Sequence, residues 1–493
     1  MNKSNILLQK FFEENGFIKA DIESYNNFID FELQKIIDEN REIEPTIIPI
    51  NVDDMKIRLD KIWVSKPEIT EADGSKRNIY PVEARLRKLS YAAPIYMEIS
   101  AHINGIQRES FQTQVGTLPI MLKSRYCHLH KLSKEELVKK GEDPYDLGGY
   151  FIINGTEKTI IKIEDLAPNK MLVTKNNTGI SAYSGNIFSE RGSYKIPHSI
   201  EKLKDGIFYI TFTRVKRIPI VPIIKALGVL KDEEIMKSID LAEDSNVYVN
   251  LYEFMDIKTD EDALDFVAKK IGITQSKEIR VERTREILDK YLLPHIGVLP
   301  EHRLQKAKNL AKYLQHFIRV SGEELPVDDK DHYMNKKIKM SGALLSDLFR
   351  INLKVLIGDM LYNFQRIVKR GKIPSIKVII RDKLLSQRIQ SSMATGNWVG
   401  GRKGVCQRIE RLNFLQTLSH LQRVISPLSN TQENFAARAL HATHLGRLCA
   451  TETPEGTNIG LRKNLALLSS TTKEASEEEV FASLKGLGLE VEE

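Results

Sequence analysis

Apolar side chains recur at helical spacing in three long segments of this chain. Residues 21–40, which begin with an aspartate suited to cap a helix, carry apolar side chains three or four positions apart. Residues 303–321 repeat the pattern before Gly322, and residues 341–370 repeat it and end in two cations before a glycine. The pattern predicts three amphipathic helices.

Residues 407–425 have a different apolar spacing. Their apolar positions step by three, and at about 3.6 residues per turn such a stripe winds around a helix. We therefore predict one internal helix with several neighbours, which presents Arg408, Arg411 and Arg423 on one side, toward carboxylates or phosphates. The apolar positions are Ile409, Leu412, Leu415, Leu418 and Leu421.

Turn signals between apolar runs predict β-hairpins in the first half of the chain. Asn104-Gly105 and Asn154-Gly155 each separate two strand-like runs, and Asp73-Gly74 is a third candidate. Asn and Gly tolerate the positive φ that a two-residue hairpin turn requires. Residues 207–212 are apolar on both faces, which indicates a buried strand. Strands and helices together predict an α+β, multidomain fold.

Composition sets the class of protein. A chain of 493 residues suits about three domains, and 41% apolar with 28% charged residues is typical of a globular protein. We find no apolar run long enough to span a membrane and no signal peptide. Three widely spaced cysteines, Cys127, Cys406 and Cys449, favour a reducing compartment over a disulfide framework. We expect a cytoplasmic protein with no membrane partner.

The net charge of +7 is unevenly distributed. Residues 334–390 hold 13 lysines and arginines against 3 acidic residues, and residues 391–470 hold 9 against 4. The last 23 residues reverse the balance, with 2 basic residues against 7 acidic ones. Solvated lysines explain such a count as well as a surface for a polyanion does, so the charge alone leaves both readings open.

A glycine-rich basic loop, GNWVGGRKG, lies at residues 396–404. It lacks the Gly-Lys-Ser/Thr ending of a nucleotide-binding P-loop. Its backbone N–H groups, with Arg402 and Lys403, suit a phosphodiester backbone, and a flexible surface turn is the alternative.

Several polar clusters lack the spacing that metal binding or nucleophilic catalysis needs. No later glycine and glutamate complete a calcium loop, and no second Cys/His pair completes a zinc site. The histidines have no serine or cysteine nucleophile motif beside them. We therefore expect no metal site and no catalytic residue in this chain. The residues considered are Asp328, Asp329, Asp331, Cys127, His128, His130, His420, His441 and His444.

The block HATHLGRLCATETPEGTNIGL, residues 441–461, resembles the fork region of the second-largest subunit of multisubunit DNA-dependent RNA polymerases. Three other blocks agree. Residues 144–161, PYDLGGYFIINGTEKTII, resemble the protrusion domain, in a wording closer to archaeal and eukaryotic forms. Residues 214–230, with IPIVPIIKALGVL, are similar to the lobe, and residues 393–421 to the start of the fork.

The resemblance implies a domain order. We expect a protrusion domain at 1–191, with an N-terminal helix, and a lobe at 192–333, both of mixed helix and sheet. A return segment of the protrusion at 334–390, a mainly helical fork at 391–470 and an acidic C-terminal tail at 471–493 should follow. Because the family subunit is usually about twice as long, the chain is similar to the N-terminal half of a subunit split between two genes, as in methanogenic archaea.

The resemblance also implies the function. The chain would form one side of a DNA/RNA cleft and the fork near the active centre, without a complete active site. Its partners would be the complementary C-terminal half, the largest subunit, other polymerase subunits, DNA template and RNA. The chain would bind no cofactor, since Mg²⁺ belongs to the largest subunit. Candidate nucleic-acid or active-centre residues are Arg402, Lys403, Arg408, Arg423, Arg438, Glu455 and Asn458.

Two other functions fit part of the pattern. A free-standing basic nucleic-acid-binding protein would share the charge asymmetry but has no need of the 441–467 block. An independent nucleotidyltransferase would need a paired-carboxylate metal motif, which the sequence lacks.

Overall fold

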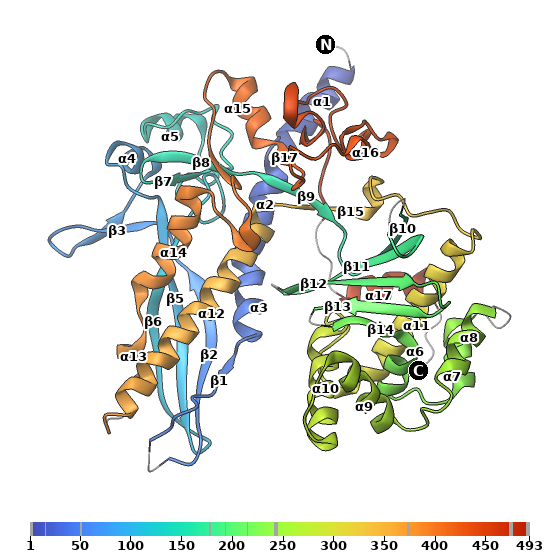
Figure 1. Ribbon diagram of the computed structural model, residues 1–493. Coiled ribbons are helices and arrows are strands. Elements are labelled where there is room, and N and C mark those ends of the chain that lie inside the picture. Colours follow the sequence, from blue (N-terminus) through green and yellow to red (C-terminus); the bar gives the residue numbers. More distant parts are fainter. Residues whose placement is uncertain are drawn as a thin grey trace. The chain divides into compact units, whose positions relative to one another are not determined.

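The structure is a computed structural model that describes residues 3–14, 16–49, 52–176, 179–192, 194–213, 215–240, 245–371, 375–472 and 477–489. The chain forms two compact units. The first combines residues 1–164 with residues 338–493, and the second is the segment Asp165–Lys337. Helices and strands occur in both units (Figure 1), which confirms the predicted α+β, multidomain fold.

One antiparallel sheet of the first unit has the strand order β1-β2-β5-β6. The predicted Asn104-Gly105 turn joins its last two strands, with φ values of 49° and 76°. A separate hairpin surrounds Asp73-Gly74, as predicted. The strands are β1 (Glu42–Ile43), β2 (Met55–Val64), β5 (Ala92–Ile103), β6 (Ile106–Pro119) and, in the separate hairpin, β3 (Glu68–Thr70) and β4 (Lys76–Asn78).

Two of the predicted helices pack together in the first unit. Residues 21–40 form α2 (Lys19–Asn27), a π-helical turn η1 (Phe28–Glu32) and α3 (Leu33–Asp38). The long helix α12 (Ser341–Val368) contacts all three segments, and α14 (Asp382–Thr395) contacts α12 and β6 (Figure 1). The rings of Phe28 and Phe349 meet edge to face in this core.

The prediction that Asp21 caps this helix is wrong. The helix begins at Lys19, and Ile18 occupies the cap position. The Asp21 carboxylate is buried instead. It accepts a 2.6 Å hydrogen bond from the Ser341 hydroxyl and lies 3.2 Å from the Lys162 ammonium. The aspartate therefore joins the start of α12 to α2.

Two further sheets lie within the first unit or at its border. Their orders are β16-β8-β7 and β15-β9-β17-β18. The chain leaves the first unit after Glu164, which lies in β9, and returns to it at Ile338, which lies in β15. The predicted Asn154-Gly155 turn joins β7 to β8, again with positive φ. The strands are β7 (Phe151–Ile153), β8 (Thr156–Ile160), β9 (Lys162–Leu166), β15 (Lys336–Lys339), β16 (Cys406–Arg408), β17 (Arg423–Ile425) and β18 (Arg462–Asn464).

The second unit is a five-stranded antiparallel meander with helices. The predicted strand at 207–212 and helix at 303–321 are confirmed as β13 and α11, and Phe208 and Phe317 meet edge to face in the core. Its elements are β10 (Met171–Lys175), β11 (Tyr183–Arg191), β12 (Tyr194–Lys202), β13 (Phe208–Phe212), β14 (Val215–Pro219), α6 (Ile220–Ala226), α7 (Asp232–Ile239), α8 (Ser245–Glu253), α9 (Asp260–Ile271), α10 (Lys277–Tyr291) and α11 (Arg303–Ser321).

The compact units divide at other positions than the domain order expected from the sequence. We expected boundaries at 191/192 and 333/334, whereas the units divide at 164/165 and 337/338. The reason is hydrogen bonding, since β10 and β11 pair in one sheet with β12, β13 and β14. Residues 165–191 therefore fold with the segment that follows them.

The single helix predicted at 407–425 is wrong. Residues there form β16, a loop, the short helix α15 (Phe414–Leu421) and β17. The Asn413 side chain accepts from the Gln416 N–H at 2.8 Å and so caps a new helix. Leu412 and Leu415, taken for core positions, are 85% and 73% exposed. Pairing of the flanking residues with β8 and β18 overrides the helical spacing.

In the described part of the acidic tail, residues Glu477–Gly486 form the helix α17. In the part of the chain that the structure describes, we find no helix with the length and apolar character to cross a membrane. The other helices are α1 (Lys3–Glu14), α4 (Pro81–Leu86), α5 (Lys134–Lys139), α13 (Ile376–Ile379) and α16 (Phe435–Arg438).

Candidate nucleic-acid interface

The glycine-rich basic loop follows α14 and is fixed at its base. Gly396 has a φ of 77°, and a Cβ there would lie 2.6 Å from the Cys406 carbonyl oxygen, so only glycine fits. The buried Trp398 ring donates from Nε1 to the Leu344 carbonyl at 2.8 Å. Lys403 at the tip is exposed. The loop thus presents the Lys403 ammonium to solvent, while Gly396 and Trp398 fix its base.

The three arginines predicted on one helix face lie in three different places. Arg408 ends β16 and is exposed. Arg423 begins β17, where its side chain is 14% exposed and one guanidinium nitrogen lies 3.8 Å from a Glu410 oxygen. Arg411 lies in the loop between Arg408 and α15 and binds two carboxylates of the N-terminal segment. Arg408 and Arg411 are both exposed, but the Arg411 guanidinium is engaged by the Asp146 and Glu157 carboxylates.

Strand β18 lies within the 441–467 block and joins this block to β17. Arg423 to Ile425 pair antiparallel with Arg462 to Asn464, and β17 also runs parallel to β9. The buried Lys463 ammonium lies 3.1 Å from the Glu164 carboxylate, which also accepts from the Ser426 hydroxyl. An ion pair removed from water therefore fixes the block to β9.

Glu455 and Asn458 lie in a tight turn ahead of β18. Glu455 precedes the 3₁₀ turn η6 (Gly456–Asn458) and is exposed, whereas Asn458 is half-buried. The Thr453 hydroxyl closes the turn: it accepts from the Gly460 N–H at 2.9 Å and donates to the Arg462 carbonyl at 3.1 Å. The turn therefore presents the Glu455 carboxylate to solvent.

Arg438 is bound through its side chain to main-chain atoms of this chain. It ends α16 and is half-buried. Its two terminal guanidinium nitrogens donate to main-chain carbonyls on both sides of it. The acceptors are the carbonyls of Asn430, Gln432, Thr457 and Ile459.

His420 has a structural role. The buried ring accepts from the Glu410 N–H at Nδ1, so Nε2 carries the proton and donates to the Gln407 side chain. Burial, with the nearby Arg423 charge, lowers the pKa of His420 to about 4. The ring is therefore neutral at pH 7 and holds β16 against α15.

Sequence reasoning missed one cluster that supports this region. Arg85 and Arg411 share the Glu157 carboxylate, each at 2.8 Å, and the Tyr150 hydroxyl accepts from Arg85 and donates to Asp146. These residues lie far apart in the chain, and the one signal was that Tyr150 and Asp146 fall in the PYDLGGYF block.

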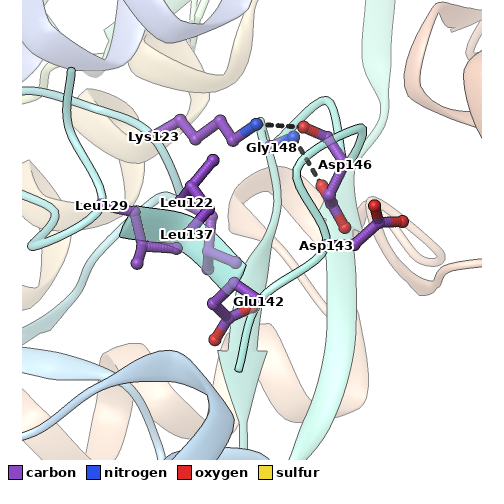
Figure 2. A pocket seen from close by; sticks show the side chains of 8 residues that line it. All are labelled: Leu122, Lys123, Leu129, Leu137, Glu142, Asp143, Asp146 and Gly148. Carbon is purple, nitrogen blue, oxygen red and sulfur yellow. Dashed lines mark hydrogen bonds between the residues drawn. The ribbon is translucent and has the colours of Figure 1, made fainter. Parts of the chain in front are cut away.

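A small cavity lies beside this cluster (Figure 2). Its volume is about 10 Å³, close to what one water molecule needs, so it is no substrate site. Figure 2 shows the Lys123 ammonium and the Gly148 N–H both pointing to Asp146, to its carbonyl and its carboxylate respectively. The lining residues are Leu122, Lys123, Leu129, Leu137, Glu142, Asp143, Asp146 and Gly148.

Among the described residues, no group of three or more histidines, cysteines, aspartates and glutamates is arranged to hold a metal ion. The exposed charged groups of the region include the cations of Lys403 and Arg408 and the carboxylates of Glu410, Glu433, Glu452 and Glu455. Cations of this kind can bind and orient a polyanion, whereas the described carboxylates are not grouped to hold a metal ion and so do not form a two-metal centre for phosphoryl transfer.

Comparison with known proteins identifies the class. A family model described as RNA polymerase beta subunit matches residues 16–391, and one described as RNA polymerase Rpb2, domain 3, matches residues 407–471. The chain belongs to the RNA polymerase beta subunit family, which confirms the resemblance predicted from the sequence.

Individual relatives refine this result. DNA-directed RNA polymerase subunit Rpo2N of Methanocaldococcus jannaschii is 42% identical over 495 residues, 98% of this chain and 99% of that protein. Subunit Rpo2N of Halobacterium salinarum is 36% identical over 98% of this chain and 95% of that protein. Subunit Rpo2 of Saccharolobus solfataricus is 41% identical over 98% of this chain but only 43% of that protein. The chain thus spans less than half of Rpo2 and nearly all of Rpo2N, as predicted for the N-terminal half of a split subunit.

Proposed function

We propose that this chain works as a core subunit fragment of a multisubunit DNA-directed RNA polymerase. It would form one side of the DNA/RNA cleft and the fork near the active centre. The observation that carries the proposal is the full-length match to Rpo2N, a protein whose name places it in such an enzyme.

The charges of the chain support a nucleic-acid contact. Lys403 and Arg408 are exposed, and both belong to the basic segment 391–470. Exposed cations without buried carboxylate partners suit phosphate oxygens, and such contacts weaken as salt rises. Arg402, Arg423, Glu455 and Asn458 lie in the same stretch and would shape this surface.

Exposed apolar side chains support a protein partner on the same region. Isolated cases are ordinary on a protein surface, but residues 412–468 hold many of them. We propose that the complementary C-terminal half of the split subunit covers them. This partner would correspond to the part of Rpo2 that this chain does not match. The residues are Leu412, Phe414, Leu415, Leu428, Phe435, Leu440, Leu445, Ile459, Leu467 and Leu468.

The assembly, rather than this chain alone, would perform template-directed nucleotidyl transfer. The metal-ion chemistry of that reaction would be supplied by Mg²⁺ on the largest subunit, as the resemblance to the family implies. This chain would position template DNA and RNA and contribute no bond-forming group. A cytoplasmic location would suit its free cysteines Cys127, Cys406 and Cys449.

Reconstitution tests the proposal. The chain is combined with its complementary half and the remaining polymerase subunits, and RNA synthesis is measured on a primed template. We expect synthesis from the assembly and none from this chain alone. Synthesis by the isolated chain would contradict the proposal, and so would an assembly equally active without it.

Interface variants test the partner assignment. Leu415→Ser combined with Phe435→Ser should weaken association with the complementary half at least tenfold. Ile106→Ser is the matched control, because Ile106 is also an exposed apolar residue, 64% exposed, but lies in the β5–β6 hairpin. Equal losses from both changes would argue against the proposed contact.

A further inference from the structure

Arg438 uses both terminal nitrogens of its guanidinium within the protein. One nitrogen donates to the carbonyls of Thr457 and Ile459, at 2.7 and 3.0 Å. The other donates to the carbonyls of Asn430 and Gln432, at 3.0 and 3.3 Å. An arginine has five N–H donors, four of them on these two nitrogens. The fork-shaped pair that would grip a phosphate is therefore already engaged.

The four acceptors belong to two separate loops. Asn430 and Gln432 lie in the loop of residues 426–434, and Thr457 and Ile459 lie in the turn of residues 453–460. Hydrogen bonds to main-chain carbonyls hold the backbone of each loop in place, whatever side chains the loop carries. A planar guanidinium with donors on two edges sets the distance and angle between the loops, which a single ammonium cannot do.

The backbone of Arg438 is held as closely as its side chain. Gly460 has a φ of 70°, and a Cβ at that position would lie 2.2 Å from the Arg438 carbonyl oxygen and 2.5 Å from its Cα. The turn therefore packs on the arginine from one side while its carbonyls bind the guanidinium from the other. The Ser426 N–H also donates to the Leu461 carbonyl at 2.9 Å, which joins the far ends of the same two loops.

We propose that Arg438 is a positioning residue, which sets the 426–434 loop against the 453–460 turn, rather than a direct contact to nucleic acid. The Glu455 carboxylate and the loop tip are then presented together as one surface. The consequence for transcription rests on the proposed function, whereas the coupling of the two loops stands on this chain alone.

Substitution by lysine separates the two roles. Lysine keeps the charge that a phosphate contact needs but has one nitrogen, which cannot span four carbonyls. Arg438→Lys and Arg438→Gln should therefore behave alike if the residue positions the loops. Arg447→Lys is the matched control, because this exposed arginine donates to the Thr443 carbonyl within its own turn.

The experiment measures amide hydrogen exchange and elongation on the same proteins. In the reconstituted enzyme, peptides covering residues 426–434 and 453–460 should exchange at least tenfold faster in both Arg438 variants and be unchanged in Arg447→Lys. Both Arg438 variants should lower the maximal elongation rate about fivefold or more, without changing the salt dependence of scaffold binding. The thermal midpoint should stay at the Arg447→Lys value, since a role in stability alone would lower it.

Wild-type behaviour of Arg438→Lys, in exchange or in elongation, would overturn the proposal. So would a shallower salt dependence in Arg438→Gln alone, which is the result for a phosphate contact. A wild-type assembly that makes no RNA would instead count against the proposed function, and the exchange comparison would still decide whether Arg438 couples the loops.

Discussion

The guanidinium carbon of Arg411 lies 4.9 Å from the centroid of the Tyr150 ring. The same guanidinium binds Glu157 at 2.8 Å and Asp146 at 3.0 Å. Arg411 precedes α15, whereas its three partners lie in residues 146–157. The contact therefore joins two segments that are far apart in the sequence: Arg411 and Glu157 are separated by 254 positions.

Arg411→Ala should destabilise the first unit. The change removes a cation–π contact and two charge-assisted hydrogen bonds, worth about 1–3 kcal/mol together. Urea unfolding followed by tryptophan fluorescence, to which Trp63 and Trp398 of the same unit contribute, measures the loss. Arg408→Ala is the control, because Arg408 is also exposed but takes no part in the contacts with Asp146, Tyr150 and Glu157, and this change should alter the midpoint little. Equal effects of the two changes would mean that the contact adds no stability.

Removing one partner of the Lys463–Glu164 ion pair should strongly lower the free energy of unfolding. Lys463→Met leaves the Glu164 carboxylate buried without its main charge partner, which predicts a loss of about 3–5 kcal/mol. Lys463→Met with Glu164→Leu removes both charges and should recover much of this loss. A double-mutant cycle in urea measures the coupling, and additive losses would contradict it.

Two glycines of α12 should respond oppositely to the same substitution. A Cβ on Gly342 would lie 2.1 Å from the Ser24 carbonyl oxygen of α2, so Gly342→Ala must separate the two helices. Gly358 has nothing within 4 Å, and Gly358→Ala should stabilise by about 0.5–1 kcal/mol through helix propensity. Thermal midpoints that fall for the first and rise for the second are expected, and a neutral Gly342→Ala would contradict the close helix contact.

Acid should destabilise the second unit through His198. This buried ring accepts from the Leu293 N–H at Nε2, and burial lowers its pKa to about 4. The unfolded chain, with an ordinary pKa of about 6.5, binds the proton first as pH falls. Stability is therefore full above pH 6.5 and declines toward pH 4, by about 3 kcal/mol in all.

The measurement for this prediction is the urea midpoint between pH 7 and pH 4.5. His198→Gln should lower the midpoint at pH 7 and flatten its pH dependence. His332→Gln, in the same unit, is the comparison, because His332 is half-buried. An unchanged pH slope in His198→Gln would mean that another group causes the acid effect.

Local signals predicted the fold where local chemistry decides it. The predicted Asn104-Gly105 and Asn154-Gly155 turns are confirmed, and the helix predicted at 341–370 is confirmed as α12 (Ser341–Val368), because turn residues and an uninterrupted apolar stripe act over a few positions. The helix at 407–425 was wrong because strand pairing with β8 and β18, which spacing cannot reveal, decides that segment.

The candidate residues divide in the same way. Lys403 lies in a loop and Arg408 at the end of a strand, and both are exposed, as their charge leads one to expect. The inward use of Arg438 could not be predicted, since four carbonyls from two loops converge on it only in the folded chain. Whether each candidate residue contacts nucleic acid stays a prediction.

The second unit is inserted into the first through strands of a single sheet, β9 and β15, which are neighbours in it. Neighbouring strands lie about 5 Å apart, so a linker of a few residues spans the two points of attachment. The hydrophobic core of each unit is built from its own residues. Such an arrangement lets evolution lengthen, shorten or replace the inserted module while the surrounding scaffold keeps its shape.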